Sequence, residues 1–154
     1  MENVWDYPRP PALEPCVRRV RVVLGGVTIA DSTQALRLRE TSHPPAIYIP
    51  PDDIVAGVLS PARTGGSFCE WKGTAHYLDV IAGGRTVSAG AWAYTDPAAR
   101  YAALRDHVAF YPGGMDQCLL DDEVVRAQEG GFYGGWITAD IEGPFKGAPG
   151  TRGW

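Results

Sequence analysis

The stretch that decides the fold is VRVVLGGVTIADS, residues 20–32. Two apolar runs flank a Gly-Gly pair, and a two-residue glycine turn between such runs is typical of a β-hairpin. The same arrangement returns where TAHYLDV (74–80) and RTVSAGAWAY (85–94) are joined by IAGG (81–84). The sequence therefore predicts two β-hairpins, each closed by glycines.

Shorter strands are predicted around these hairpins. ALRLRE (35–40) alternates apolar and charged residues, as a half-buried strand does. PPAIYIPP (44–51) reads as a short strand that its prolines confine to the edge of a sheet. VAFY (108–111) and CLL (118–120) favour two further strands.

Two segments favour short helices. DDIVAGVLS (52–60) can be capped by Asp52. Its buried face would consist of Ile54, Val55, Val58 and Leu59. DPAARYAALRDH (96–107) offers Asp96 as a cap and Pro97 as the first helical residue. Many short strands with only two short helices predict a mainly β protein of antiparallel sheets.

Composition narrows the classes of function. The chain of 154 residues fits one domain, and its net charge of −4 does not suggest a nucleic-acid binder. The densest basic stretch, residues 18–21, shows the alternation of a strand whose charged side chains face the solvent. The N-terminus lacks the apolar core of a signal peptide, and no apolar run has the length of a membrane span.

Cys16, Cys69 and Cys118 are far apart, which is typical of reduced thiols. We therefore expect a cytoplasmic protein that binds neither nucleic acid nor membranes; composition leaves the oligomeric state open.

Several segments together resemble the family called domain of unknown function 427 (DUF427). They are YPRPP, VRVVLGGVTIADS, RETSHPPAIYIPPDDI, CEWKGTAHY, AWAYTDP and VAFYPGGMD. The resemblance runs from about Trp5 to Trp154, and residues 130–154 look like an ending carried by a subset of that family. It implies a β-tent-like fold, in which two antiparallel sheets lean together and leave a cleft. It also implies one domain (1–154), with an N-terminal arm (1–16) and a Gly-rich C-terminal strap (about 130–154).

The resemblance implies neither a metal nor an activity. Many β-tents are held by a zinc ion on four cysteines, but the three cysteines and three histidines of this chain are scattered. We therefore expect no zinc, no other metal and no cofactor, and the five tryptophans are suited to holding the sheets by apolar packing. The family has no established activity to carry over.

Lysine occurs at two places only, Lys72 and Lys146, while arginine occurs twelve times. A lysine ammonium can lose its proton when it is desolvated, whereas an arginine guanidinium cannot. Lys72 is therefore a candidate for a cleft group that holds an anion or acts as a base. Alternatively, its stem packs on Trp71 with the head in water, or it pairs with a buried carboxylate.

Glu40 is the candidate partner of Lys72. It shares the parity of Leu36 and Leu38 on the predicted strand 35–40, which places its carboxylate on the inner face. An inward carboxylate is costly unless it is paired. We expect a Glu40–Lys72 pair, which would supply the acid–base residues if the protein is an enzyme; alternatively Glu40 lies past the strand end, in water.

The remaining candidate ligand-binding residues are Tyr48, Cys69, Trp71, Trp92 and Tyr94. Tyr48 faces away from its two isoleucine neighbours, and Trp92 and Tyr94 share one face of their strand, as core residues or as the wall of a cleft. Cys69 precedes Lys72, whose ammonium would lower the pKa of the thiol, although small buried cysteines are common.

These observations favour a small-molecule-binding protein whose inter-sheet cleft holds a small polar or anionic ligand. One alternative is a metal-free enzyme that acts on a small metabolite with Lys72 and Glu40 as acid–base residues. Another is a protein-interaction module that adds a partner strand at the edge 44–51. Lys146 lies in the glycine-rich tail, and if the tail covers the cleft, both lysines converge on one acidic ligand.

Overall fold

The structure is a computed structural model that describes residues 1–63, 66–69, 71–130, 133–148, 150–151 and 154. It confirms the mainly β class predicted from the hairpins. The layers expected from the sequence are present as open antiparallel sheets of two to five strands. One short ribbon is parallel instead. The helices in the described ranges are short 3-10 segments, and none of them is long and apolar enough to cross a membrane.

The largest sheet holds the second predicted hairpin. Its strands, in order, are β11 (Val108–Phe110), β10 (Arg85–Ala93), β9 (Gly73–Ala82) and β7 (Leu59–Pro61), with β8 (Ser67–Cys69) beside another part of β9. The register of β9 and β10 shifts between Val87 and Ala91, where the Asp79 carboxylate accepts a hydrogen bond from Ala89 N–H.

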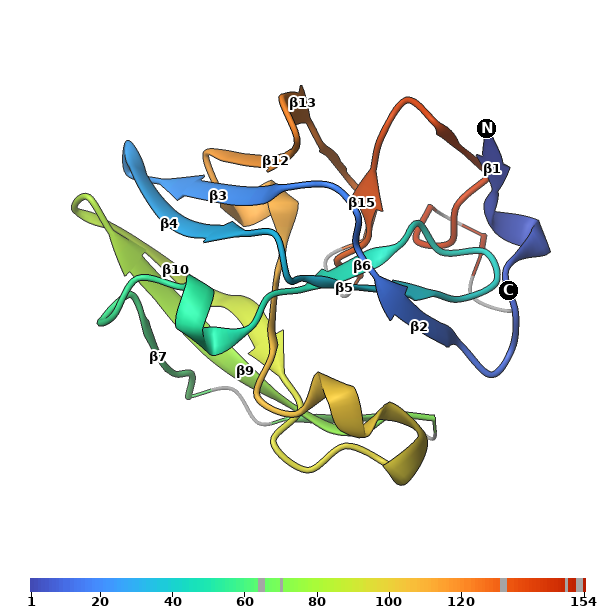
Figure 1. Cartoon of the computed structure of the whole chain (residues 1–154), viewed down its shortest axis with the longest axis horizontal. Helices are drawn as coiled ribbons and strands as arrows, with labels where there is room; N and C mark the ends of the chain where they lie inside the picture. Colours follow the sequence, from blue (N-terminus) through green and yellow to red (C-terminus); the bar gives the residue numbers. More distant parts are fainter. Residues whose placement is uncertain (64–65, 70, 131–132, 149, 152–153) are drawn as a thin grey trace.

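A four-stranded sheet holds the first predicted hairpin. Its order is β13 (Glu123–Val124), β12 (Gln117–Leu120), β3 (Val20–Leu24) and β4 (Val27–Ser32). The tips of the two hairpins meet at one end of the molecule, where a Cβ atom on Gly83 would lie 2.0 Å from the Gly25 carbonyl oxygen. From this contact the two sheets diverge (Figure 1), which is the geometry of a tent.

A third sheet spans the open end. It consists of β2 (Ala12–Pro15), β5 (Leu36–Arg39) and β6 (Ala46–Tyr48). Ile49 N–H donates to the Val108 carbonyl and Val108 N–H to the Ile49 carbonyl, both at 2.8 Å, so this sheet is joined to the largest one. Trp136 N–H donates to the Pro45 carbonyl. The edge at residues 44–51, where the alternative of an interaction module would add a partner strand, is therefore already bonded at both ends.

The N-terminal and C-terminal segments pack on each other. They form a parallel ribbon of β1 (Glu2–Asn3) with β16 (Ile141–Glu142). Within the C-terminal segment, β14 (Arg126–Ala127) pairs antiparallel with β15 (Trp136–Ile137). Phe145 packs against Val4, Tyr7 and Ile141. The rings of Trp5 and Trp154 lie 5.1 Å apart, centroid to centroid.

Neither predicted helix forms as expected. Pro51–Asp53 (η2) is a single 3-10 turn, after which Ile54 pairs with Ala30 and Leu59 begins β7. Val55, expected to be buried, is exposed. The apolar residues of this segment pair and pack with strands of neighbouring sheets. These tertiary contacts override the local helix propensity.

The second predicted helix is also shorter than expected. It is a 3-10 segment, Ala99–Leu104 (η3), that begins after Ala98 without a side-chain cap. Asp96 forms a long surface ion pair with Arg105 instead. The remaining 3-10 segments are η1 (Val4–Asp6) and η4 (Pro112–Gly114).

Two apolar clusters lie on opposite faces of β10, because successive side chains of a strand point to opposite faces. Ala91 and Ala93 face the main core, with Val22, Leu24, Ile29, Val80 and Phe110. Trp92 and Tyr94 face a second cluster, with Leu38, Tyr48, Ala75, Tyr101, Leu104 and Ala109. Tyr48 also belongs to this second cluster, whereas its neighbours Ile47 and Ile49 belong to the main core, so the predicted parity is confirmed.

Candidate functional site

A cavity of about 290 Å³ lies beside the second cluster, between β5–β6 and the strands β8, β9 and β10. The C-terminal segment closes its remaining side with Gln128, Tyr133, Gly134, Gly135 and Lys146. Ligand pockets usually exceed about 300 Å³, so this cavity suits a small molecule.

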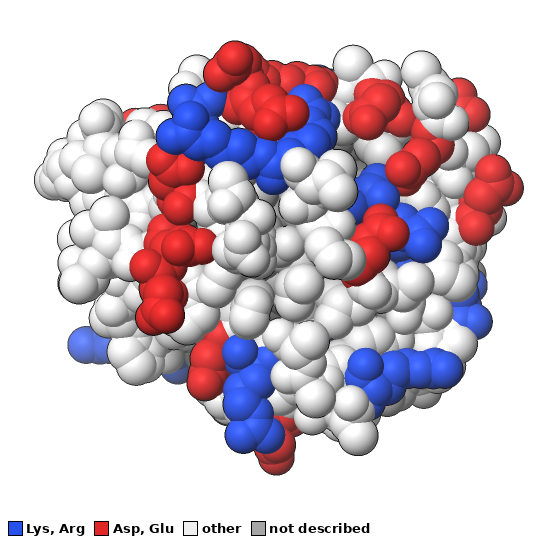
Figure 2. Space-filling view, viewed as in Figure 1, with Lys and Arg blue, Asp and Glu red and all other residues white. Residues whose placement is uncertain are grey.

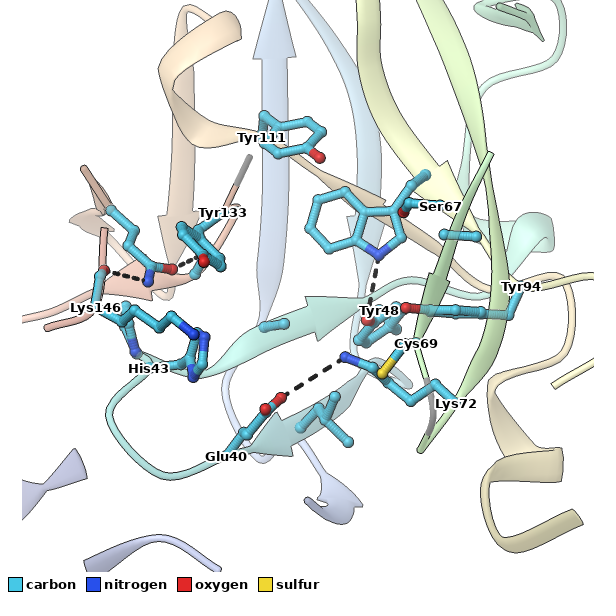
Figure 3. Close-up of a pocket in the computed structure, with 18 of the residues that line it drawn as sticks. Glu40, His43, Tyr48, Ser67, Cys69, Lys72, Tyr94, Tyr111, Tyr133 and Lys146 are labelled. Carbon is cyan, nitrogen blue, oxygen red and sulfur yellow. Dashed lines mark hydrogen bonds and ion pairs between the residues drawn. The ribbon is translucent and has the colours of Figure 1, made fainter. Parts of the chain in front are cut away.

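Lys72 reaches the cavity from the turn that precedes β9. Its carbonyl accepts a hydrogen bond from Ala98 N–H at 2.9 Å, which fixes the turn. Its Nζ atom lies 3.8 Å from Oε1 of Glu40, the residue that follows β5 (Figure 3). The expected Glu40–Lys72 pair is therefore present. The Lys72 side chain is 13% exposed and that of Glu40 is 22% exposed, so both lie mostly out of water.

Lys72 is a stable cation in this setting. Burial lowers the pKa of the Lys72 ammonium, but its interactions with Tyr48 and with the Glu40 carboxylate outweigh burial, and the pKa lies above its ordinary value of 10.5. A lysine that stays protonated can hold an anion, whereas it cannot accept a proton. The electrostatics thus favour an anion-holding Lys72 over a basic one.

Aromatic side chains form the walls around Lys72. Trp92 Nε1–H donates to the Tyr48 hydroxyl at 3.3 Å, with the two rings nearly perpendicular. The rings of Trp92 and Tyr111 lie 4.6 Å apart. Lys72 Nζ lies 5.9 Å from the centre of the Tyr94 ring. Burial raises the pKa of Tyr48 and that of Tyr94, so both hydroxyl groups keep their protons at neutral pH.

His43 enters the cavity from a tight turn after β5. His43 N–H donates to the Glu40 carbonyl at 3.0 Å, which places these two side chains beside each other. Ser42 adopts a left-handed φ of 69° within this turn, a conformation that is costly for a residue with a Cβ atom. Burial lowers the pKa of the His43 imidazole below 6.5, and Lys146 and Lys72 act in the same direction, against Glu40. The ring is therefore neutral at pH 7.

Lys146 is held in the same wall by backbone hydrogen bonds. Lys146 N–H donates to the Ser42 carbonyl at 2.8 Å, and the Lys146 carbonyl accepts from Gln128 Nε2 at 2.6 Å. Gln128 Oε1 accepts from Gly135 N–H in turn. Gly134 packs so closely on Trp92 that a Cβ atom would lie 2.4 Å from the indole ring. Figure 3 shows Lys146 and His43 on one side of the cavity and Lys72 and Tyr94 on the other.

One comparison with known proteins gives a match. A sequence model of the family described as domain of unknown function (DUF427) matches residues 12–121, more than half of the chain. The chain belongs to the DUF427 family. No curated protein matches it. Within this DUF427 protein, Glu40, Tyr48, Lys72 and Trp92 lie in the matched region, while Gln128 and Lys146 lie beyond it.

Six of the seven site residues expected from sequence line the cavity of this DUF427 protein. They are Glu40, Tyr48, Cys69, Lys72, Trp92 and Tyr94. Trp71 does not line it and packs, half-buried, against the second apolar cluster. His43 and Gln128 were missed, because they lie in turns and loops where no periodicity indicates the direction of a side chain. Tyr111, the last residue of the predicted strand 108–111, was also missed as a lining residue.

Several charged groups elsewhere in the DUF427 protein pair with one another. Arg18 pairs with Asp121 and Glu123, Arg19 with Asp31, and Arg21 with Asp122. Figure 2 shows this mixture of positive and negative side chains at the edge where β3 and β13 lie. Across the residues that the structure describes, no three His, Cys, Asp or Glu side chains gather as metal ligands.

Proposed function

We propose that this DUF427 protein binds a small monoanion with a flat apolar body, such as an aromatic carboxylate, in the cavity between Lys72 and Lys146. The observation that carries the proposal is that both lysines of the chain line one cavity, although the protein as a whole is acidic. The charged side chains among the described lining residues are Lys72, Lys146 and Glu40, which sum to +1 with His43 neutral. A monoanion balances this charge.

The walls support a flat apolar body. Aromatic rings prefer offset or edge-to-face contacts with one another, and Tyr48, Trp92 and Tyr111 already stand in such a series. A planar ligand can extend this series. Lys72 Nζ lies beyond hydrogen-bond distance of Glu40, so its N–H groups can donate to a carboxylate.

Binding of benzoate and of its neutral isostere benzamide, measured by calorimetry or by NMR titration, tests the proposal. We expect benzoate to bind at least about tenfold more tightly than benzamide, because an ammonium–carboxylate hydrogen bond contributes about 1.5–3 kcal/mol. Lys72→Met and Lys146→Met keep much of the apolar stem and should each weaken benzoate binding about tenfold.

Arg85→Met is the matched control, because Arg85 forms a surface ion pair with Asp116 and does not line the cavity. Equal affinity for benzoate and benzamide would overturn the proposal, as would an equal loss in the control. Lys146→Met keeps the test decisive if Lys72→Met does not fold.

A further inference from the structure

We propose that the same cavity catalyses proton transfer at a carbon atom next to a carbonyl group of the bound anion, with His43 as the acid–base residue. The inference rests on the proposed function, since it requires the anion to bind between the two lysines. It assigns a catalytic role to a residue that the sequence did not single out.

The hydrogen bonds of His43 define which ring nitrogen can react. Nδ1 lies 2.9 Å from the Thr41 carbonyl oxygen, which can only accept, so Nδ1 carries the proton. In the neutral ring Nε2 then has a lone pair. In the described part of the chain no group hydrogen-bonds to Nε2, and the ring lines the cavity. A neutral imidazole with an open lone pair is the usual general base at neutral pH.

The backbone holds this imidazole in a fixed position. His43 N–H is bonded to the Glu40 carbonyl, and the carbonyl of the preceding residue, Ser42, is bonded to Lys146 N–H. The ring of Tyr133 packs edge-on against the imidazole at 5.4 Å between centroids. Preorganisation of this kind lowers the reorganisation needed during proton transfer.

Two ammonium groups in one cavity suit a ligand with two oxygen functions. One can hold a carboxylate, and the other can stabilise the negative charge that develops on a neighbouring carbonyl oxygen when a C–H proton leaves. A 2-oxo acid with a flat apolar group has this combination: a carboxylate, an adjacent carbonyl and an acidic C–H bond at C3.

The step balances without any co-reactant. His43 Nε2 takes a proton from C3, the electron pair of the broken C–H bond forms the C2–C3 double bond, and the carbonyl oxygen becomes an enolate oxygen beside an ammonium group. The imidazolium then returns a proton to C3 or to the enolate oxygen. The net reaction is keto–enol interconversion, and in D₂O it exchanges the C3 protons for deuterium.

Phenylpyruvate in D₂O is the probe, with loss of the C3 proton signal followed by ¹H NMR and binding measured separately by titration. We expect exchange faster than in buffer alone, and a loss of that acceleration by about a hundredfold or more in His43→Gln, because general-base catalysis contributes about 10²–10⁴-fold. Binding of phenylpyruvate to His43→Gln should change by less than about threefold, because Gln keeps a polar side chain at this position.

His107→Gln is the matched control. His107 Nδ1 lies 3.1 Å from the carbonyl oxygen of Arg105, two residues before it, as His43 Nδ1 does to Thr41, but His107 lies outside the cavity. This variant should exchange at the wild-type rate. The exchange rate of the wild type should also decrease at pH values below the pKa of His43, since protonation removes the lone pair.

The outcomes separate the two proposals. Binding of phenylpyruvate with exchange at the buffer rate, or exchange that persists in His43→Gln, overturns the catalytic role and leaves the proposed function standing. Failure of both phenylpyruvate and benzoate to bind overturns the proposed function and this inference together.

Discussion

Lys72 Nζ and Glu40 Oε1 lie 3.8 Å apart, within the range of an ion pair but beyond that of a hydrogen bond. The carboxylate keeps the ammonium charged without occupying its N–H groups. Such a loose pair differs from the bonds that Arg37 forms, at 2.6 Å to Glu2 and 2.7 Å to Glu14. The N–H groups of Lys72 are therefore available to the anion of the proposed function.

Glu40→Gln should strengthen anion binding. The substitution removes the one carboxylate among the described lining residues, which raises the cavity charge from +1 to +2. We expect the affinity for benzoate to rise about threefold to tenfold, since charges a few ångströms apart interact by about 1 kcal/mol or more near a protein surface. Calorimetry measures the change, with Glu142→Gln as control because Glu142 is exposed and does not line the cavity. Unchanged or weaker binding in Glu40→Gln would show that Lys72 and the carboxylate do not share the ligand site.

His43 should make stability depend on pH. Burial lowers its pKa in the folded state below the unfolded value of 6.5. The neutral ring therefore contributes stability that is present above pH 6.5 and is lost as the pH falls through the folded pKa. When the pH is lowered from 7.5 to 5, the Tm of the wild type should decrease more than the Tm of His43→Gln, as measured by thermal unfolding. His107→Gln should follow the wild type, and parallel curves for wild type and His43→Gln would contradict the prediction.

Gly134→Ala should disturb the cavity wall. The added Cβ would lie 2.4 Å from the Trp92 ring, so the ring or the tail must move. We expect a loss of about 1–3 kcal/mol of stability, weaker benzoate binding and a shift of the tryptophan fluorescence. Gly113→Ala is the control, because its Cβ would meet Ala127 at an ordinary 3.6 Å. The packing argument is wrong if both variants behave alike.

Gly25→Ala should destabilise the fold more than Gly26→Ala. Both glycines have left-handed φ values, +60° and +76°, so alanine costs about 1 kcal/mol at either place. At Gly25 the Cβ would also lie 2.3 Å from the Ala82 carbonyl oxygen, while at Gly26 it meets nothing within 4 Å. Denaturant unfolding should show a further loss of about 1–3 kcal/mol at Gly25. Equal losses would mean that the hairpin tips do not touch.

Ser42→Gly should stabilise the protein. Ser42 is fully buried with φ at 69°, and its hydroxyl has no hydrogen-bond partner among the described residues. Glycine adopts this conformation without the Cβ penalty and removes the unpaired hydroxyl, so the free energy of unfolding should rise by about 1 kcal/mol. Chemical unfolding tests this, with Ser88→Gly on the exposed part of β10 as control, where glycine should destabilise.

Much of the fold follows from local patterns. The hairpins at 20–32 and 74–94 combine alternating strands with Gly-Gly turns, and the same alternation placed Tyr48 and Trp92 on the cavity side. The helix predicted for residues 52–60 was wrong. The apolar spacing of this segment fits a helix, but its residues pair with strands that are distant in sequence, as Leu59 does with Val80. Strand pairing of this kind is not encoded in the local sequence.

The candidate site was predictable only where a strand defines the direction of its side chains. Parity with Leu38 placed Glu40 correctly on the inner face, and the rarity of lysine drew attention to Lys72 and Lys146. The position of His43 depends on the left-handed Ser42 and on the hydrogen bond from Lys146, which is distant in sequence. No local pattern contains that information.

The tail that closes the cavity has a consequence for how ligand preference can diversify. Gln128, Tyr133 and Lys146 follow the region that defines the family, whereas Lys72 and most of the aromatic wall lie within it. A relative with another ending would keep the inner half of the chamber and present a new outer half. Under the proposed function, the terminal segment would therefore set which ligands fit, while the scaffold and Lys72 stay the same.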